Sequence, residues 1–273
     1  MNEPKIKKNI QEIQPIAPYP SFTLRLYAVW YRHVRVYTKH LYSNGTPPFF
    51  EPLIFLAGIG LGLNKYIHII NGIEYLQFLA TGLVVSTAMF TATFECTFGT
   101  FIRLVYDKVY DGMLAASITV NDLLIGEIIW AGTKGLFFSS AVLIVMALFG
   151  IITNPLSLLS PLVGFLTGLM FSVLAMIITS YVKTINHFNF YFTGFISPMF
   201  FFSGTVFPTN ELPAIALPIV EALPLTHAVR LSRGICLGNI NPTIMVFDLM
   251  YAVFFIMLGG FCAIKLLKKR LIE

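Results

Sequence analysis

Four charged residues stand inside strongly apolar stretches of the sequence, where an ionised side chain is costly to bury unless it has a partner. They are Glu95, Glu127, Lys134 and Asp248. Glu127 and Lys134 are seven residues apart, so a helix would place both on one face. Glu95 or Glu127 could pair with Lys134, or these groups could contact a substrate. Glu127 and Asp248 lie near the ends of their stretches, where simple exposure at a surface is expected.

One further group could carry catalysis: His227 with Glu221 and Arg230. Glu221 and His227 are six residues apart, a poor pairing on one helix, so the cluster is a weak catalytic candidate. The three cysteines, an odd number without close spacing, indicate neither a disulfide framework nor a metal site. The histidines are scattered without metal-ligand spacing. We therefore predict no catalytic residue and no bound metal. The cysteines are Cys96, Cys236 and Cys262, and the other histidines are His33, His40, His68 and His187.

The composition indicates the environment in which this chain folds. Only 11% of its 273 residues are charged, against about 25% in soluble domains, and its mean hydropathy is +0.78. The polar residues could not cover the surface of so large an apolar core. These values exclude a soluble enzyme, a disordered chain and a secreted disulfide scaffold. They indicate an all-α integral membrane protein.

A membrane-spanning helix needs about 20 mostly apolar residues, and the sequence offers six candidates. The first is short, rich in glycine, and contains Glu51 and Pro52, so it is the weakest. We expect a flexible cytoplasmic arm at 1–20, punctuated by prolines, followed by a single transmembrane domain at 21–273. The six predicted spans lie near 49–63, 75–101, 123–151, 156–181, 188–207 and 243–267.

The distribution of basic residues predicts the orientation. Six spans place both termini on one side, and that side would hold fourteen Lys and Arg residues against three on the other. Basic loops stay in the cytoplasm, so both termini are predicted to be cytoplasmic. The net charge of +5 is explained by these topology signals, and no nucleic-acid partner is expected.

Two segments outside the spans have helical amphipathic patterns. In segment 21–42 an apolar face with aromatic residues opposes a basic face, which is typical of a helix lying in the membrane interface; packing on a soluble partner is the alternative. Its marker residues are Arg25, Trp30, Arg32 and Arg35. The cytoplasmic segment 103–122 could insert a short helix into a groove of another protein or lie on the membrane without a partner. Its residues at helical spacing are Tyr106, Val109, Tyr110, Asp111, Met113 and Leu114.

The external connection between the fifth and sixth spans, which runs from Ser203 to Arg233, is apolar but too interrupted by proline for one spanning helix. It predicts a re-entrant helical hairpin, marked by Pro208, Glu211, His227 and Arg230. Aromatic residues also concentrate in the fifth span. They could stack on sugar rings or line a lipid path, although ordinary packing explains most such residues. This candidate substrate path comprises Phe188, Tyr191, Phe192, Phe200, Phe201 and Phe202.

Several long strings occur in order along the chain: Glu51-Pro-Leu-Ile-Phe-Leu-Ala-Gly, Ala92-Thr-Phe-Glu95, Tyr110-Asp-Gly-Met-Leu114, Pro198-Met-Phe-Phe-Phe-Ser-Gly-Thr-Val-Phe-Pro208 and Leu223-Pro-Leu-Thr-His227. With the span pattern, they make residues 22–270 similar to the ABC-2 type exporter permeases, and most similar to the NodJ-like branch of lipooligosaccharide exporters. The stretch Ala115-Ala-Ser-Ile-Thr119 lacks the Thr-Pro usual in that branch, which leaves a local kink in doubt.

The resemblance implies a homodimeric permease in the bacterial inner membrane. Each copy would join a separately encoded ATPase subunit, which would bind ATP and magnesium, because this chain has no phosphate-binding loop. The helix within 106–116 would couple the two subunits. The substrate would be an amphiphile of the lipid-linked saccharide class, which the name of the branch implies. Export of a drug or another hydrophobic compound is the alternative, and a membrane transferase is a weaker one.

Overall fold

The computed structural model describes residues 20–62, 66–67, 69–70 and 72–272. The predicted arm at 1–20, apart from Pro20, lies outside the described residues, as does His68. The described chain is helical except for loops and one small antiparallel hairpin, in which β1 (Ile69–Ile70) pairs with β2 (Ile73–Glu74). An all-α architecture is thereby confirmed.

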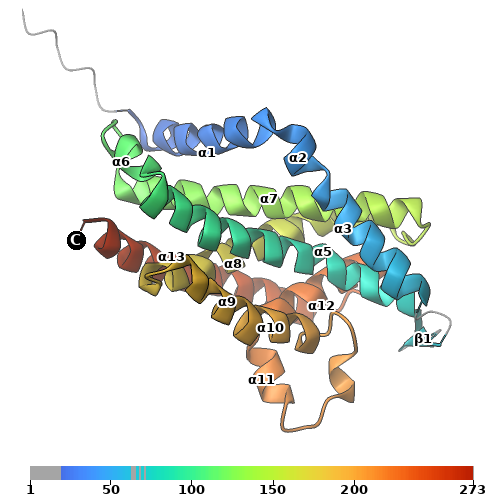
Figure 1. Cartoon of the computed structure of the whole chain (residues 1–273). Coiled ribbons are helices and arrows are strands. Elements are labelled where there is room, and N and C mark those ends of the chain that lie inside the picture. The colour runs from blue at the N-terminus through green and yellow to red at the C-terminus, as the bar shows by residue number, and fades with distance from the viewer. Residues whose placement is uncertain (1–19, 63–65, 68, 71, 273) are drawn as a thin grey trace, which may run out of the picture.

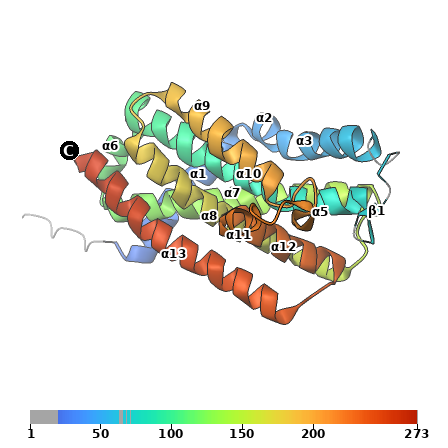
Figure 2. The same cartoon turned by 90° about the horizontal axis from the view of Figure 1, so that it is seen from below.

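Four helical segments in the described chain are long and apolar enough to cross a membrane: Tyr75–Tyr106, Val120–Leu148, Pro155–Tyr181 and Pro242–Leu271. They contain α5 (Tyr75–Phe94), α7 (Val120–Leu148), α8 (Ser160–Tyr181) and α13 (Pro242–Ile272), and correspond to the predicted second, third, fourth and sixth spans. The segment containing α5 is the central one, with 89% of its apolar window buried, whereas α13 lies outermost, with 11% buried (Figure 2).

The predicted first and fifth spans are helical but interrupted. In the first, α3 (Pro47–Phe55) follows the short α2 (Leu41–Gly45) and continues as the π-helix η1 (Leu56–Leu61). The fifth is divided into α9 (Phe188–Tyr191), the π-helix η6 (Phe192–Ile196) and α10 (Ser197–Phe202), after the 3-10 turn η5 (Ile185–His187). Neither forms one long uninterrupted α-helix, so the total of six spans stays a prediction.

Close packing of α7 on α8 depends on small residues. A Cβ atom added to Gly164 would lie 1.9 Å from Ser139 Oγ, and one added to Gly168 would lie 2.9 Å from the Cα atom of Gly132. Small residues let two helices approach closely, which is how apolar helices associate without a hydrophobic driving force between them. The α7–α8 pair is therefore closely packed, and α5 packs against both helices.

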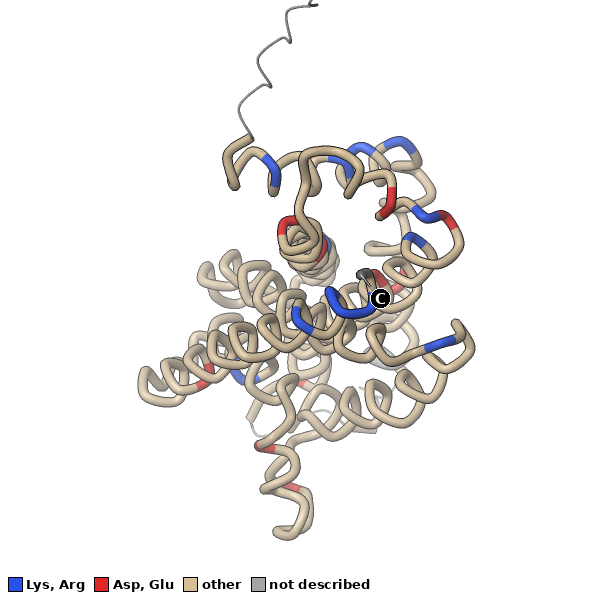
Figure 3. Tube along the Cα trace, turned by 90° about the vertical axis from the view of Figure 1, so that its left-hand side faces the viewer, with Lys and Arg blue, Asp and Glu red and all other residues tan. Residues whose placement is uncertain are grey.

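The two ends of the bundle differ. Near one end lie the beginning of α1 (Phe22–Lys39), α6 (Val109–Leu114) and the C-terminus, whereas the β1–β2 hairpin lies at the other (Figure 1). Lys and Arg residues gather at the first end (Figure 3). This is the charge asymmetry on which the predicted orientation rests, so we refer to the first end as the basic end.

The 3-10 turn η4 (Pro155–Leu159) lies between α7 and α8. The connection before α13 begins with the 3-10 turn η7 (Thr209–Glu211), and its body is α11 (Leu217–Ala222) and α12 (Pro224–Leu237). The segment leading to α11 projects from the bundle, whereas α12 packs against α5, α8 and α13 (Figures 1 and 3). Two helices are thus present where the sequence predicts a hairpin. Their re-entry into the membrane stays a prediction.

Candidate functional site

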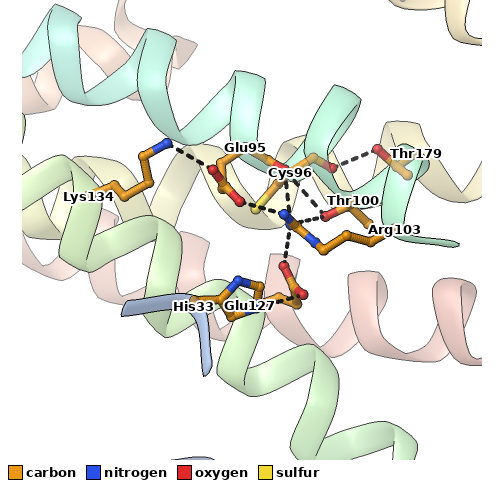
Figure 4. Close-up of polar contacts among 8 residues, drawn as sticks. All are labelled: His33, Glu95, Cys96, Thr100, Arg103, Glu127, Lys134 and Thr179. Carbon is orange, nitrogen blue, oxygen red and sulfur yellow. Dashed lines mark hydrogen bonds and ion pairs between the residues drawn. The ribbon is translucent and has the colours of Figure 1, made fainter. Parts of the chain in front are cut away.

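A cluster of charged side chains is buried between α1, α5 and α7, toward the basic end of the bundle (Figure 4). The Arg103 guanidinium lies at its centre and donates to Glu95 Oε1 at 2.8 Å and to Glu127 Oε2 at 2.7 Å. Lys134 Nζ donates to the second Glu95 oxygen at 2.8 Å. His33 Nε2 lies 2.9 Å from Glu127 Oε1. Each carboxylate therefore has two partners, and we call these five residues the Arg103 cluster.

Burial raises the free-energy cost of breaking these ion pairs. The Glu127 side chain is 0% exposed and that of Arg103 is 15% exposed. A buried ion pair adds little net stability over apolar packing, but removal of one partner strands the other charge in a poorly solvated site. The cluster therefore links α1, α7 and the helical segment after α5 through ion pairs that are costly to break singly.

The geometry of the cluster argues against a metal centre. Ligand atoms of His33, Glu95 and Glu127 lie within 4.8 Å of one another, which is close enough to hold a cation. Both carboxylates, however, already pair with Arg103 and Lys134. A divalent ion would have to displace these two positive charges or stand beside them. The arrangement is better suited to a permanent link between helices.

Widened helical turns position Glu95 and Arg103. After Phe94 the helix continues as two π-helical segments, η2 (Glu95–Gly99) and η3 (Ile102–Tyr106). In a regular α-helix residues eight apart diverge by about 80° around the axis, whereas here both side chains reach the same point. Thr179 Oγ1 of α8 donates to the Cys96 carbonyl within η2 at 2.8 Å, which fixes this segment further. Single π turns within helices are frequent at functional sites.

The predicted coupling segment lies directly after this π-helical stretch. Of its predicted residues, Tyr110 and Met113 of α6 are buried, Val109 and Leu114 are half-buried, and Tyr106 and Asp111 are exposed. Burial, reinforced by the Glu127 charge, raises the pKa of the Tyr110 hydroxyl. A partner protein could therefore contact Tyr106 and Asp111, while Tyr110 faces the interior. The role of the segment itself stays a prediction.

Helix α1 forms where the amphipathic pattern predicts it, and it runs along α7. Arg25 Nε donates to Asp122 Oδ2 at 2.7 Å, and Trp30 Nε1 donates to Thr133 Oγ1 at 3.0 Å. Between them, a Cβ atom added to Gly126 would lie only 2.5 Å from Val29 Cγ1.

The other two basic markers of α1 point elsewhere: Arg32 is half-buried, and the exposed Arg35 lies 6.0 Å from the Tyr31 ring. One face of α1 is thus occupied by this chain's own α7. Its location in the membrane interface stays a prediction.

The predicted aromatic path is partly a packing cluster and partly a surface. Phe188 is fully buried and Tyr191 nearly so, whereas Phe201 and Phe202 are about half exposed. The half-buried Phe192 has its ring centroid 4.4 Å from that of Phe94, and Phe200 stands 5.7 Å from Phe90. Aromatic side chains of α5 and of the α9–α10 segment therefore form one continuous set. Helices α9 and α10 lie on the opposite side of the bundle from α13 (Figure 2).

A second charge cluster lies on the other side of the molecule, between α11, α12 and α13. Asp248 Oδ1 accepts from Arg230 Nη2 at 2.6 Å and lies 2.7 Å from His227 Nδ1. Arg230 Nη1 also donates to the Glu221 carboxylate at 2.6 Å. His227 Nε2 lies 2.9 Å from the Glu221 carbonyl oxygen, and its ring stacks on Tyr251 at 3.7 Å. We call this group the Asp248 cluster. Of the other two hairpin markers, Pro208 is buried and Glu211 exposed.

The structure decides between the sequence-based expectations for the four intramembrane charges. Pairing of Glu95 with Lys134 is confirmed, whereas Glu127 pairs with Arg103 and His33 instead. The expectation that Glu127 and Asp248 are exposed is wrong, because their side chains are 0% and 1% exposed. Burial is possible because each meets a cationic partner from another segment.

Sequence reasoning missed two members of the Arg103 cluster, Arg103 and His33, and it also missed Asp122, the partner of Arg25. Arg103 was counted only as a topology signal, His33 as an isolated histidine, and Asp122 as part of a loop. The only available signal for Arg103 was its position eight residues after Glu95, which on a regular helix argues against a contact. Asp122 could have been found as the N3 residue of a capping box, since its side chain accepts from the Thr119 backbone amide and its own amide donates to Thr119 Oγ1.

These features define a class: a multi-pass α-helical membrane protein with buried interhelical ion pairs. The family model for ABC-2 type transporters matches residues 25–237, and the chain belongs to this family. It is 35% identical over 260 residues to Nodulation protein J of Rhizobium leguminosarum bv. trifolii, covering 94% of this chain and 98% of that protein. It is 34% identical over 246 residues to Nodulation protein J of Sinorhizobium fredii (strain NBRC 101917 / NGR234), covering 90% and 94%.

Proposed function

We propose that this chain is the transmembrane subunit of an ATP-driven exporter that moves an amphiphile carrying saccharide units out across the bacterial inner membrane. Membership of the ABC-2 family supports a transport subunit. The observation that carries the proposal further is the Arg103 cluster. It joins the segment that leads into α6 to α1, α5 and α7 through buried charges.

The proposed mechanism uses this connection. A separately encoded ATPase subunit, with bound ATP and magnesium, contacts the exposed side of α6 around Tyr106 and Asp111. ATP can shift the equilibrium between two states of the complex because the ATPase binds it with different affinity in each. A displaced α6 pulls on Arg103, three residues before Tyr106, and Arg103 pulls on Glu95 and Glu127. Movement at the basic end thereby reaches the middle of the bundle.

Co-purification tests the partnership. The tagged protein is purified from its native membranes in mild detergent, and ATPase activity is measured in the eluate. We expect the wild type to recover an ATPase, and Asp111→Lys to reduce the recovered activity at least tenfold. Lys183→Glu is the matched control, because Lys183 is an exposed charge in the loop after α8. Absence of ATPase from the wild-type eluate, or an equal loss with Lys183→Glu, would contradict the proposal.

The surface opposite α13 supports our inferences about a second copy and about the class of substrate. A cavity of about 420 Å³ between α3, α5 and α7 is lined by polar and aromatic side chains: Glu51, Phe90, Thr91, Phe94, Lys134 and Phe138. Glu51 is exposed, and a charged side chain that faces lipid within a span is costly. We infer that this flank faces a second copy and a substrate path. Carboxylate and hydroxyl groups can bond to sugar hydroxyls, while phenyl rings cover sugar faces or acyl chains.

Transport measurements test the substrate class. Vesicles that contain the permease and its ATPase are supplied with a fluorescent lipooligosaccharide or with a hydrophobic dye. We expect ATP-dependent transport of the lipooligosaccharide, reduced at least fivefold by Glu51→Gln. Phe254→Leu, on the exposed surface of α13, is the matched control and should transport normally. Transport of the dye alone would favour the alternative, a drug exporter.

A membrane transferase finds less support in the geometry. Both ring nitrogens of His227 already face partners within the chain, Asp248 on one side and the Glu221 carbonyl on the other. No ring nitrogen is left to accept a proton from a substrate, which a general base must do. We therefore expect His227→Ala to retain transport, whereas a transferase that relied on this residue would lose nearly all activity.

The proposed orientation, with both termini in the cytoplasm, follows from the basic end described above. Single cysteines introduced at Lys183 and at Asn210 offer a direct test, because both positions are exposed and lie on opposite predicted sides. In intact cells from which the outer membrane barrier has been removed, an impermeant maleimide should label position 210 but not position 183. The native cysteines are replaced first.

A further inference from the structure

Arg233 on α12 is half-buried, and its positive charge has no carboxylate partner among the described residues. Its Nη2 donates to the carbonyl oxygens of Phe78, at 3.1 Å, and Gly204, at 2.9 Å. Its Nε reaches Thr81 Oγ1 at 3.4 Å, and the guanidinium carbon lies 3.8 Å above the Phe78 ring. Nη1 makes no hydrogen bond with any residue that the structure describes.

The neighbouring Arg230 is a useful contrast. Burial lowers the pKa of Arg230, but its bonds to Asp248 and Glu221 outweigh this and raise the pKa above its ordinary value. Burial lowers the pKa of Arg233 to about 10, with no carboxylate to oppose it. Arg233 remains protonated near neutral pH. Carbonyl oxygens solvate its charge but do not neutralise it, so an anion that reached Arg233 would supply the missing charge.

A cavity gives access to this guanidinium. It has a volume of about 240 Å³ and lies between α12, the 238–241 turn and the start of α13. Its polar lining comprises Arg230, Arg233, Asn239, Asn241 and Asp248. Asp248 does not fill the role of the anion, because its two oxygens are engaged by His227 and Arg230.

The first turn of α13 also borders the cavity. Ile244 and Met245, in that turn, are lining residues, and α13 is 31 residues long. The N-terminus of a helix presents unpaired backbone amides and a partial positive charge, both of which favour anions. Asn241 accepts from the Ile244 amide at a long 3.4 Å, which leaves this end only weakly capped. Two arginines and a helix N-terminus thus face one cavity.

We propose that this cavity binds the phosphate group of an anionic phospholipid, with Arg233 Nη1 as the principal donor. A phosphodiester offers several acceptor oxygens to a guanidinium and pairs with it strongly. The acyl chains would lie along α13, where the surface beyond the cavity is apolar and exposed at Phe247, Met250 and Phe254. This adjoining apolar surface favours a lipid over a free phosphate ion. The proposal does not depend on the transported substrate or on an ATPase partner.

Thermal unfolding of the purified full-length protein in nonionic detergent tests the proposal. The probes are phosphatidylglycerol, diacylglycerol with the same acyl chains, and inorganic phosphate. A ligand that binds only the folded protein raises the unfolding midpoint as its concentration rises, which yields an apparent Kd. We expect stabilisation by phosphatidylglycerol alone. Equal stabilisation by diacylglycerol would overturn the proposal, and stabilisation by inorganic phosphate at similar concentrations would assign the site to the free ion and overturn the lipid.

Two variants locate the effect in the cavity. Arg233→Gln should weaken the apparent Kd for phosphatidylglycerol at least tenfold. Gly234→Leu fills the cavity while it leaves Arg233 in place, and an added Cβ at Gly234 meets only the Asn239 carbonyl oxygen at an ordinary 3.6 Å. Gly234→Leu should therefore weaken the apparent Kd for phosphatidylglycerol to a similar extent. This variant tests the proposal even if Arg233→Gln does not fold. Arg35→Gln removes an exposed arginine of α1 and should bind normally. Unchanged affinity in Gly234→Leu would overturn the proposal.

Discussion

The two charge clusters of this protein differ in which parts of the chain they connect. The Arg103 cluster joins α1, the π-helical segments after α5, and α7. These segments are far apart in the sequence, because His33 and Glu127 are separated by 94 residues. The Asp248 cluster joins consecutive elements, α11, α12 and α13, and Arg230 and Glu221 are 31% and 50% exposed. The first cluster therefore fixes the bundle as a whole, whereas the second fixes a local corner.

This difference predicts unequal consequences of substitution. Loss of a charge from the Arg103 cluster leaves its partners in a site that is largely buried, with Glu127 fully so. Loss of a charge from the Asp248 cluster can be relieved in part by water at Glu221 and Arg230. If the Arg103 cluster transmits motion, its disruption should also uncouple transport from ATP hydrolysis, an effect that the Asp248 cluster should not have.

The largest effect is expected from Arg103→Ala, which leaves both Glu95 and Glu127 without their shared partner. Removal of one member of a buried ion pair costs about 3–5 kcal/mol. We expect a large fall in the midpoint of thermal unfolding in detergent and a low yield of folded protein. Arg103→Lys keeps the charge but cannot bridge two carboxylates as a guanidinium does. Its unfolding midpoint should therefore lie between those of the wild type and Arg103→Ala. Wild-type stability of Arg103→Ala would refute the central role of this residue.

A smaller effect is expected from Gly126→Ala, which separates α1 from α7 without changing a charge. The new Cβ atom would stand 2.5 Å from Val29 Cγ1, and overpacking of this kind typically costs about 1–3 kcal/mol. Displacement of α1 also moves His33, one turn after Val29, away from Glu127. The double variant Gly126→Ala with Val29→Ala restores the space, and we expect it to recover most of the lost unfolding midpoint. A double variant no better than the single one would show that the contact is not the cause.

Arg230→Gln tests the second cluster. It leaves the buried Asp248 with His227 as its remaining partner, and an unsatisfied buried group costs about 1–3 kcal/mol. We expect a moderate fall in unfolding midpoint with the ratio of transport to ATP hydrolysis unchanged. Measurement of both quantities in the same vesicles separates the clusters. A greater loss of coupling in Arg230→Gln than in Arg103→Lys would reverse the comparison.

The smallest effect is expected from Glu221→Gln. Its carboxylate is 50% exposed, and exposed ion pairs contribute about 0–1 kcal/mol. The contact between the Glu221 carbonyl and His227 is made by the backbone and is retained. We expect an unfolding midpoint close to that of the wild type, measured beside Arg230→Gln. A fall as large as that of Arg230→Gln would mean that Glu221 is the more important partner of Arg230.

Much of the fold could be predicted because long apolar runs leave little choice. Within lipid the backbone must satisfy its own hydrogen bonds, so an apolar run of this length becomes a helix whatever its neighbours are. Four of the predicted spans meet that condition in the described chain. The amphipathic pattern of residues 21–42 likewise predicted α1.

The candidate site could be predicted only in part. Glu95, Glu127 and Lys134 stood out because a charge in an apolar run is conspicuous, and one pair among them was foreseen. Arg103 could not be placed, because the π-helical turns that bring it to Glu95 break the periodicity on which sequence reasoning depends. Tyr110 was expected on the surface of a coupling helix and is buried. Lys108, immediately before α6, has a left-handed conformation with a φ of 49°, which the helical spacing does not predict.

The sequence by itself determined the class of protein, the positions of the long helices, the asymmetry of charge between the two ends and the similarity to a family. Each of these follows from local composition, which needs no knowledge of neighbours. Only the tertiary structure decided which charges meet, which face of α6 is exposed and that Arg233 lacks a counter-charge. Those outcomes depend on helix rotation and on contacts between distant segments, where a shift of one residue around the axis changes every partner.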